Sequence, residues 1–247
     1  MTPAIAAVVL LATIATSFLS SIFGMLGGLI LMGVLVSVLP VAGAMVLHGL
    51  IQLTANGYRA FLNRRDIRWG VMGVYTLGGV VALGALAAVA YVPDRATVFL
   101  VLGALPFVAA VLPERLALDI TRPFMPFWAG FVVVLTNLIS GVGGPLLDVF
   151  FQRTDMTRHA VVATKAVGQS LGHTAKIIFF GGVVAAGSSD DWPSAMLLAG
   201  CVVFSMVGTT LGKRVLDGLA DRTFFRWTQR ILLGVGAVLL LRGVSLL

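Results

Sequence analysis

Lysine, histidine and glutamine side chains recur within one short stretch of otherwise small and apolar residues, "KAVGQSLGHTAK", which spans residues 165–176. The residues on either side, "VVAT" and "IIFFGGVVAAG", are typical of a bilayer-spanning segment. A charged side chain at that depth costs about 2.5–3.5 kcal/mol on insertion scales, and it is usually kept for function. Cationic and amide groups are suited to holding a small anion.

A second stretch carries polar residues at the same spacing. A shift of 117 residues aligns the four positions of the two stretches: His48 with Lys165, Gln52 with Gln169, Asn56 with His173, and Arg59 with Lys176. In each stretch the positions follow at i, i+4, i+8 and i+11, so they occupy one face of a helix about 16 Å long. Neither face contains an acidic residue. We expect the two faces to line a basic, hydrogen-bonding path.

Glycine-rich breaks precede both stretches. The sequences are "FGMLGG" (residues 23–28) and "SGVGGP" (residues 140–145), and superposing them aligns Gly27–Gly28 with Gly143–Gly144. Glycine and proline interrupt helices here, and neither junction offers a polar loop long enough to reach water. We predict two hairpins of broken or re-entrant helices, with Gly24 and Gly141 also in their turns.

The composition defines the class of protein. Hydrophobic residues make up 59% of the chain, charged residues 11%, and the mean hydropathy is +1.03, whereas soluble domains carry about 25% charge. The net charge of +7 comes from bases in short loops, which indicates membrane anchoring rather than a nucleic-acid partner. The single cysteine, Cys201, excludes an intramolecular disulfide and is expected to pack between helices. The N-terminus lacks the basic region of a cleaved signal peptide, so we interpret it as the first membrane segment.

Ten apolar segments follow one another along the chain. They cover residues 3–23, 25–39, 41–62, 70–91, 96–112, 125–139, 142–151, 159–187, 194–212 and 224–246. The sequence therefore predicts an all-α integral membrane protein. We expect two repeats, 1–123 and 124–247, within one integrated transport domain; each repeat is a glycine-broken hairpin followed by three transmembrane helices.

The distribution of basic residues predicts the orientation. If both hairpins enter and leave on one side, three groups of bases fall in the cytoplasm: Arg59, Arg64, Arg65 and Arg68; Arg115, Arg122 and the loop 151–159; and Lys213, Arg214, Arg222 and Arg226. The loops 91–97 and 187–194 then lie outside, with Arg95 as their only base. Both termini are extracytoplasmic, and the two halves are inverted copies of each other.

Inverted repeats with broken helices are a recurring transporter architecture, with the substrate near the midplane. Interrupted helices expose N–H groups and a positive dipole end to an anion. We expect the hairpin N–H groups, Ser21, Asn137 and Ser140 to bind anion oxygens. Positive charge would come from Lys165, His48 and His173, orientation from Gln52, Gln169 and Asn56, and the mouth of the pathway from Arg59 and Lys176. If transport is proton-coupled, a histidine is the titrating group, because its unperturbed pKa is near 6.5.

Each feature also has a purely structural interpretation. Arg59, Lys165 and Lys176 can extend their charges to lipid headgroups. The glutamines can join helices by hydrogen bonds, the histidines can be packed and satisfied, and the glycines can serve close helix packing. Asp148 can pair with a base or carry a proton.

The two halves, "SSIFGMLGGLILMGVLVSVLP…HGLIQLTANGYRAFLNRRDIRW" and "TNLISGVGGPLLDVFF…KAVGQSLGHTAKIIFFGG", resemble the TauE/SafE sulfite-exporter family, also called the toluene-sulfonate uptake permease family. The resemblance covers essentially the whole chain. It implies transport of sulfite, sulfonates or related organosulfur anions across a prokaryotic inner membrane. It places the family's glycine-rich hairpins on Gly24, Gly27 and Gly28, and on Gly141, Gly143 and Gly144. Many members have a third consecutive glycine, where this chain has Leu29 and Pro145.

The leading hypothesis is therefore a secondary transporter for a small sulfur-containing anion, embedded in membrane lipids and working by alternating access. No cofactor, metal or ATP is expected, since no G-x-x-x-x-G-K-[ST] loop is present. A passive anion channel is the alternative. An intramembrane enzyme is less favoured, because the chain has no H-E-x-x-H, G-x-S-x-G or carboxylate pair. The anion, the direction of transport, proton or sodium coupling and the oligomeric state stay open.

Overall fold

The computed structural model describes residues 2–23, 25–111, 118–152, 154–186, 193–216 and 221–247. These residues form ten α-helices and one 3₁₀ turn, η1 (Arg64–Asp66), and contain no strand. Each of the ten predicted apolar segments corresponds to one helix, so the all-helical prediction is confirmed. The helices are α1 (Pro3–Phe23), α2 (Leu26–Val38), α3 (Val41–Leu62), α4 (Trp69–Ala88), α5 (Arg95–Val111), α6 (Met125–Ser140), α7 (Gly144–Phe151), α8 (Arg158–Ala186), α9 (Ala195–Leu216) and α10 (Asp221–Val244).

Both predicted helix breaks are present. The first helix ends at Phe23 and the next begins at Leu26, whereas the second break separates Ser140 from Gly144. Helix α7 has only eight residues, about 12 Å of helix, which is less than half the thickness of a bilayer core. It can therefore enter the membrane but cannot cross it.

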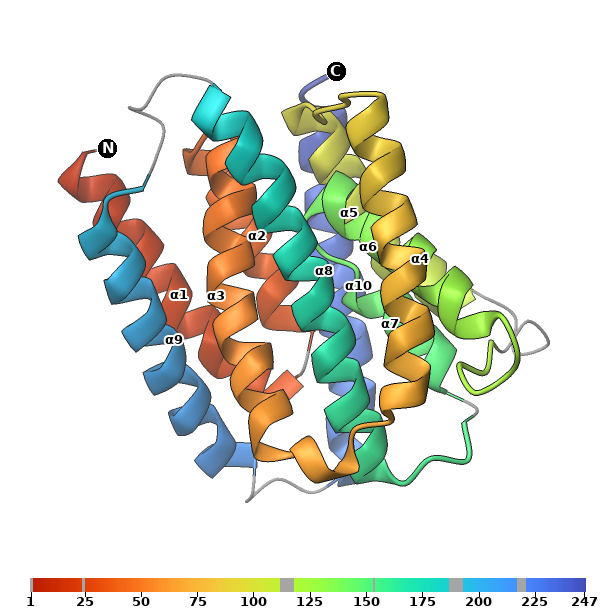
Figure 1. Ribbon diagram of the computed structural model, residues 1–247. Helices are drawn as coiled ribbons and strands as arrows, with labels where there is room; N and C mark the ends of the chain where they lie inside the picture. The colour runs from red at the N-terminus through yellow and green to blue at the C-terminus, as the bar shows by residue number, and fades with distance from the viewer. Residues whose placement is uncertain (1, 24, 112–117, 153, 187–192, 217–220) are drawn as a thin grey trace.

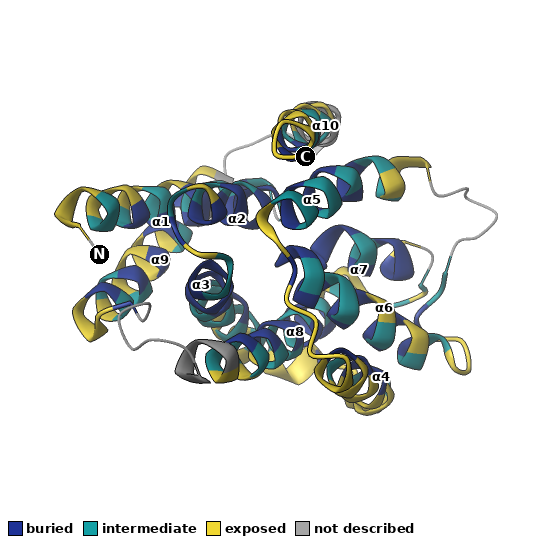
Figure 2. Ribbon diagram, turned by 90° about the horizontal axis from the view of Figure 1, so that it is seen from above, coloured by how far each residue is buried: buried dark blue, intermediate teal, exposed yellow. Residues whose placement is uncertain are grey.

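Helices α3 and α8 pack against each other in the middle of the molecule and run in opposite directions (Figure 1). Seen from above, they lie between the α1–α9 pair and the α4–α6 pair, while α5 and α10 pack together along one side (Figure 2). Helix α8 has 29 residues and so is about 43 Å long, enough to run past the hydrocarbon core at both ends. The two polar stretches found in the sequence thus lie on neighbouring helices.

Glycines allow the helices of the α4–α6 pair and of the α1–α9 pair to pack with their backbones in contact. A Cβ added at Gly78 of α4 would overlap the carbonyl oxygen of Phe127 in α6, and one added at Gly130 would overlap that of Tyr75. On the other side, a Cβ at Gly212 of α9 would lie 2.5 Å from the carbonyl oxygen of Phe18 in α1. Small residues at such contacts are the usual means of joining membrane helices, because lipid provides no hydrophobic force between them.

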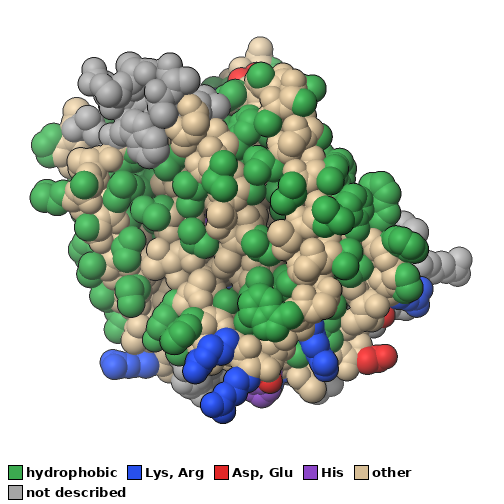
Figure 3. All heavy atoms as spheres, viewed as in Figure 1, with side chains coloured by type: hydrophobic (Ala, Val, Ile, Leu, Met, Phe, Trp, Pro, Cys, Tyr) green, Lys and Arg blue, Asp and Glu red, His purple; other side chains and the backbone are tan. Residues whose placement is uncertain are grey.

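The surface has the two zones of a membrane protein. Lysine and arginine side chains gather at the lower edge of the view in Figure 3, and hydrophobic side chains dominate the face above it. Three of the described helical segments are long and apolar enough to cross a bilayer, namely Pro3–Phe23, Trp69–Ala88 and Ala195–Gly212. The chain is thus a multi-pass membrane protein by length and composition.

The basic edge contains the end of α3, η1 and the start of α8, whereas both chain ends lie at the opposite edge (Figure 1). Among the residues used to predict orientation, Arg115 and the loop residues 187–192 lie outside the described part of the chain. The same holds for Gly24 of the first hairpin and for the side chains of Lys213, Arg222 and Arg226.

We predict that Gly78→Ala lowers the free energy of unfolding by about 1–3 kcal/mol, because the new methyl group must displace the α6 backbone. Thermal unfolding of the purified protein in detergent measures this. The matched control is Gly84→Ala in the same helix, where an added Cβ meets nothing within 4 Å. Equal unfolding temperatures for the two variants would contradict the close α4–α6 contact.

Candidate anion site between the broken helices

The turn at the second helix break, between α6 and α7, is stabilised by backbone hydrogen bonds and by one hydroxyl group. Gly141 has φ +82°, a conformation that favours glycine, and its N–H donates to the Asn137 carbonyl at 2.8 Å. The Ser140 hydroxyl lies 2.9 Å from the carbonyl oxygens of both Thr136 and Val142. These contacts end α6 and turn the chain into α7, so Ser140 stabilises the break itself.

Corresponding glycines at the two breaks have corresponding surroundings. A Cβ added at Gly27 would overlap the carbonyl of Thr16 in α1, and a Cβ added at Gly143 would lie 2.6 Å from the carbonyl of Val133 in α6. In both hairpins, therefore, the first glycine of the pair lets the short helix pack directly on the backbone of the helix before it.

The second glycine of each pair faces a glutamine. The Gln52 amide nitrogen would lie 2.6 Å from a Cβ added at Gly28, and the Gln169 amide nitrogen 3.1 Å from one added at Gly144. Each glutamine thus lies over the first turn of a short helix, α2 or α7, where the backbone N–H groups are not used within the helix. Any larger residue in place of either glycine would push the amide away.

Two central side chains join the two breaks. His48 Nε2 lies 2.9 Å from the carbonyl oxygen of Gly28, and His48 Nδ1 lies 2.7 Å from the Lys176 ammonium nitrogen. Lys176 also donates to the carbonyl oxygen of Gly141 at 2.8 Å. We call this series of contacts, from Gly28 through His48 and Lys176 to Gly141, the polar bridge. It connects the first hairpin to the second through α3 and α8.

The position of Lys176 corrects one expectation from the sequence. The spacing along the helix placed it toward the mouth of a pathway, but its side chain is fully buried and contacts both α3 and the second break. Burial excludes the interpretation that Lys176 extends its charge to lipid headgroups. The depth of a side chain depends on the helices that pack around it, and not on the distance from the end of its own helix.

Lys176 is a buried lysine without an acidic partner in the described part of the chain. Removing an ion from water costs several kcal/mol even after the protein relaxes, and two neutral acceptors offset only part of that cost. A site of this kind favours an added anion, because the anion supplies the missing opposite charge. The arrangement can thus bind and release a small negatively charged solute.

Two further buried polar groups lie near this cation. The His173 ring is 5.6 Å from the His48 ring, and His173 Nδ1 has no hydrogen-bond partner among the described residues. The amide nitrogen of Asn137 would lie 2.9 Å from a Cβ at Gly172, next to His173, while its oxygen also lacks a partner. Buried polar atoms are nearly always satisfied, so these two atoms are hydrogen-bonding groups available to a ligand or a water molecule.

Lys165 lies apart from this group and is paired. Its ammonium group forms an ion pair with Asp148 of α7, and both side chains are about one quarter exposed, at 25% and 26%. Of the two roles considered for Asp148, pairing with a base is the one found. Lys165 thus has a carboxylate partner within the protein, whereas Lys176 has none among the described residues.

The remaining expected residues serve local contacts. Ser21 donates to the carbonyl of Thr209 at 2.8 Å and thereby joins α1 to α9. Asn56 donates to the carbonyl of Gln52 at 3.0 Å and accepts a 3.4 Å bond from Arg59. The structure therefore groups His48, His173, Lys176 and Asn137, places the two glutamines over the short helices, and leaves Ser21 outside this group.

Tyr75 was not identified from the sequence as a buried polar residue beside α8. Its phenol is fully buried on α4, its hydroxyl has no partner among the described residues, and its ring is 3.4 Å from a Cβ added at Gly168. A lone tyrosine within the apolar run "WGVMGVYTLGG" was the available signal.

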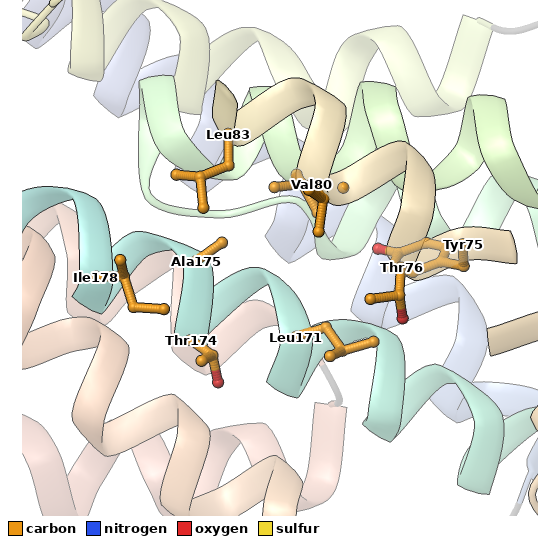
Figure 4. Close-up of a pocket in the computed structure, with 10 residues that line it drawn as sticks. Tyr75, Thr76, Val80, Leu83, Leu171, Thr174, Ala175 and Ile178 are labelled. Carbon is orange, nitrogen blue, oxygen red and sulfur yellow. The ribbon is translucent and has the colours of Figure 1, made fainter. Parts of the chain in front are cut away.

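Tyr75 also lines a cleft of about 140 Å³ between α4 and α8 (Figure 4). The other walls are mainly apolar, and Val80 and Ile178 are 58% and 62% exposed on the outer flank. The cleft opens toward lipid and lacks the charge that an anion requires.

Comparison with known proteins agrees with these features. The family model described as "Sulfite exporter TauE/SafE" matches residues 9–240, nearly the whole chain. No curated protein and no solved structure shows a significant match. The chain belongs to the TauE/SafE sulfite exporter family, and it is a membrane transporter of the anion-exporter type.

Proposed function

We propose that this protein is a secondary transporter that moves a small sulfur-containing anion, such as sulfite or a sulfonate, across the membrane by alternating access. The observation that carries the proposal is the fully buried Lys176 ammonium, which has two neutral acceptors and no carboxylate partner among the described residues. The family supplies the class of substrate. Transport then requires no covalent chemistry from the chain, only binding and a change of access.

The two halves, 1–123 and 124–247, are proposed to be inverted repeats. Exchanging α1–α5 with α6–α10 turns the α1–α9 pair into the α6–α4 pair and the α4–α8 contact into the α9–α3 contact, and all four contacts are present. The equal surroundings of Gly28 and Gly144 support the same relation. Such halves allow rocking about a central site, because each can take the conformation of the other.

The proposed site residues have different roles. Lys176, His48, His173 and Asn137 form the part that supplies charge and hydrogen bonds to the anion oxygens. Gln52 and Gln169 orient the anion at the N-termini of α2 and α7. We assign Ser140 and the hairpin glycines to keeping the breaks open, and the Lys165–Asp148 pair to the cytoplasmic side.

The protein is proposed to lie in a prokaryotic inner membrane with both termini outside. The basic edge that contains Arg64, Arg65 and Arg68 then faces the cytoplasm, as positively charged loops do.

We predict that Val92→Cys reacts with a membrane-impermeant maleimide in intact cells, because Val92 is 41% exposed at the edge opposite the basic one. Arg65→Cys, also exposed, should react only after the membrane is permeabilised. The wild type is the control, since its single cysteine, Cys201, is fully buried. The reverse labelling pattern would overturn the proposed orientation.

We predict that purified protein in liposomes takes up labelled sulfite or methanesulfonate, and that Lys176→Gln lowers this flux more than about tenfold. The loss follows because a hydrogen bond to a charged group contributes about 1.5–3 kcal/mol. Lys165→Gln is the matched comparison: it removes the same charge from the same helix at a position already paired with Asp148, and it should retain most of the flux.

Unlabelled anion on the far side should accelerate uptake, as in a carrier and not in a channel. Equal flux in Lys176→Gln and wild type, with both folded, would remove Lys176 from the mechanism. An absence of flux for every sulfur anion by the wild type would overturn the proposed function.

A further inference from the structure

The polar bridge has room for one proton between its two nitrogens. His48 Nδ1 and the Lys176 nitrogen are 2.7 Å apart, a distance that requires one donor and one acceptor. Three arrangements satisfy this contact: an ammonium donates to a neutral ring, a charged ring donates to a neutral amine, or a neutral amine donates to a neutral ring; His48 Nε2 donates to Gly28 in each case. With both groups protonated, two donors would face each other and the contact would break.

The surroundings oppose a second positive charge in the empty protein. Lys176 and His48 are fully buried, and His173 lies beside them. Helices α2 and α6, which supply the carbonyl acceptors around the bridge, contain no titratable side chain. Besides the residues already named, the titratable groups on the other neighbouring elements are Tyr58 and Arg59 on α3, Arg158, His159 and Lys165 on α8, Tyr75 on α4, Asp148 on α7, and Cys201, Lys213 and Arg214 on α9. Of these only Asp148 is a carboxylic acid, and it is paired with Lys165.

We propose that the Lys176–His48 pair holds one proton in the empty transporter and takes up a second proton together with the anion. This inference rests on the proposed function and adds the proton stoichiometry and the atoms involved. A proton from water binds at His48 Nδ1, and the Lys176 ammonium turns from that nitrogen to an oxygen of the anion. The anion supplies the opposite charge for the second proton, so each stabilises the binding of the other.

The same step breaks the polar bridge between the two hairpins. When Lys176 leaves His48, the bridge from Gly28 to Gly141 is interrupted, and α3 is no longer joined to the second break. Loading with anion and proton thus removes a contact that holds the halves in one arrangement. A monovalent anion and its proton cross without net charge.

Isothermal titration calorimetry measures the proton directly. Methanesulfonate and thiosulfate are suitable probes, because both are fully ionised near neutral pH and every proton taken up then comes to the protein. Titrations are carried out at pH 8 in Tris and in imidazole, which contain no sulfonate. The difference between the two binding heats equals the number of protons exchanged times the difference between the ionisation enthalpies of the buffers. We expect uptake of about one proton per bound anion and binding that weakens up to about tenfold per pH unit as the pH rises.

His48→Gln tests proton uptake independently of the hydrogen bonds of the polar bridge. A glutamine side chain can accept from Lys176 and donate to Gly28, but it cannot be protonated. This variant should bind the anion more weakly and take up no proton. His159→Gln is the matched control, because it makes the same change at an exposed histidine at the start of α8 and should leave uptake unchanged.

Anion binding by the wild type without proton uptake would overturn this inference and leave the proposed function standing. Unchanged uptake in His48→Gln would overturn the assignment to the pair. If neither anion binds to the wild type, then the proposed function fails for those anions and this inference fails with it. The wild-type titrations decide the stoichiometry even if His48→Gln does not fold.

Discussion

A lysine ammonium group buried without a carboxylate partner is the constraint around which the centre of this protein is arranged. Lys176 has a histidine nitrogen at 2.7 Å and a backbone carbonyl at 2.8 Å, and neither acceptor carries a full negative charge. The Gly141 carbonyl is available because α6 ends at Ser140, with Gly141 as its C-cap, instead of continuing across the membrane. The break in the helix and the burial of Lys176 therefore depend on each other, and the proposed anion would supply the opposite charge that a buried ammonium group lacks.

The paired glycines have similar surroundings at the two helix breaks. At each break one glycine lets the short helix pack on the preceding backbone, and the next glycine makes room for a glutamine amide. Each amide lies over the first turn of its short helix, where free N–H groups are favourable for a solute with negatively charged oxygens. The two lysines of α8 differ, because Lys165 is paired with Asp148 whereas Lys176 has no carboxylate partner among the described residues. In the proposed function, this difference makes Lys176 the group that meets the anion.

Much of this architecture follows from the sequence by simple physics. Runs of apolar residues predicted the ten helices, and the glycine-rich stretches predicted both breaks, although Gly27 and Gly28 lie in the first turn of α2 and the left-handed conformation is found at Gly141. The spacing of polar residues predicted that α3 and α8 present polar faces, and His48 does meet His173 and Lys176. The central place of Lys176 did not follow, since distance along one helix says nothing about which other helices cover it. Tyr75 and the commitment of Ser21 to α9 were missed for the same reason: both depend on contacts between segments far apart in the chain.

An experimental structure with a bound sulfur anion tests the central claim most directly, and the quantity to measure is the distance from the Lys176 nitrogen to its neighbours. We predict anion density in hydrogen-bonding contact with that nitrogen, and a separation from His48 Nδ1 well beyond the present 2.7 Å. Density at another place, with Lys176 still bonded to both His48 and Gly141, would contradict the account.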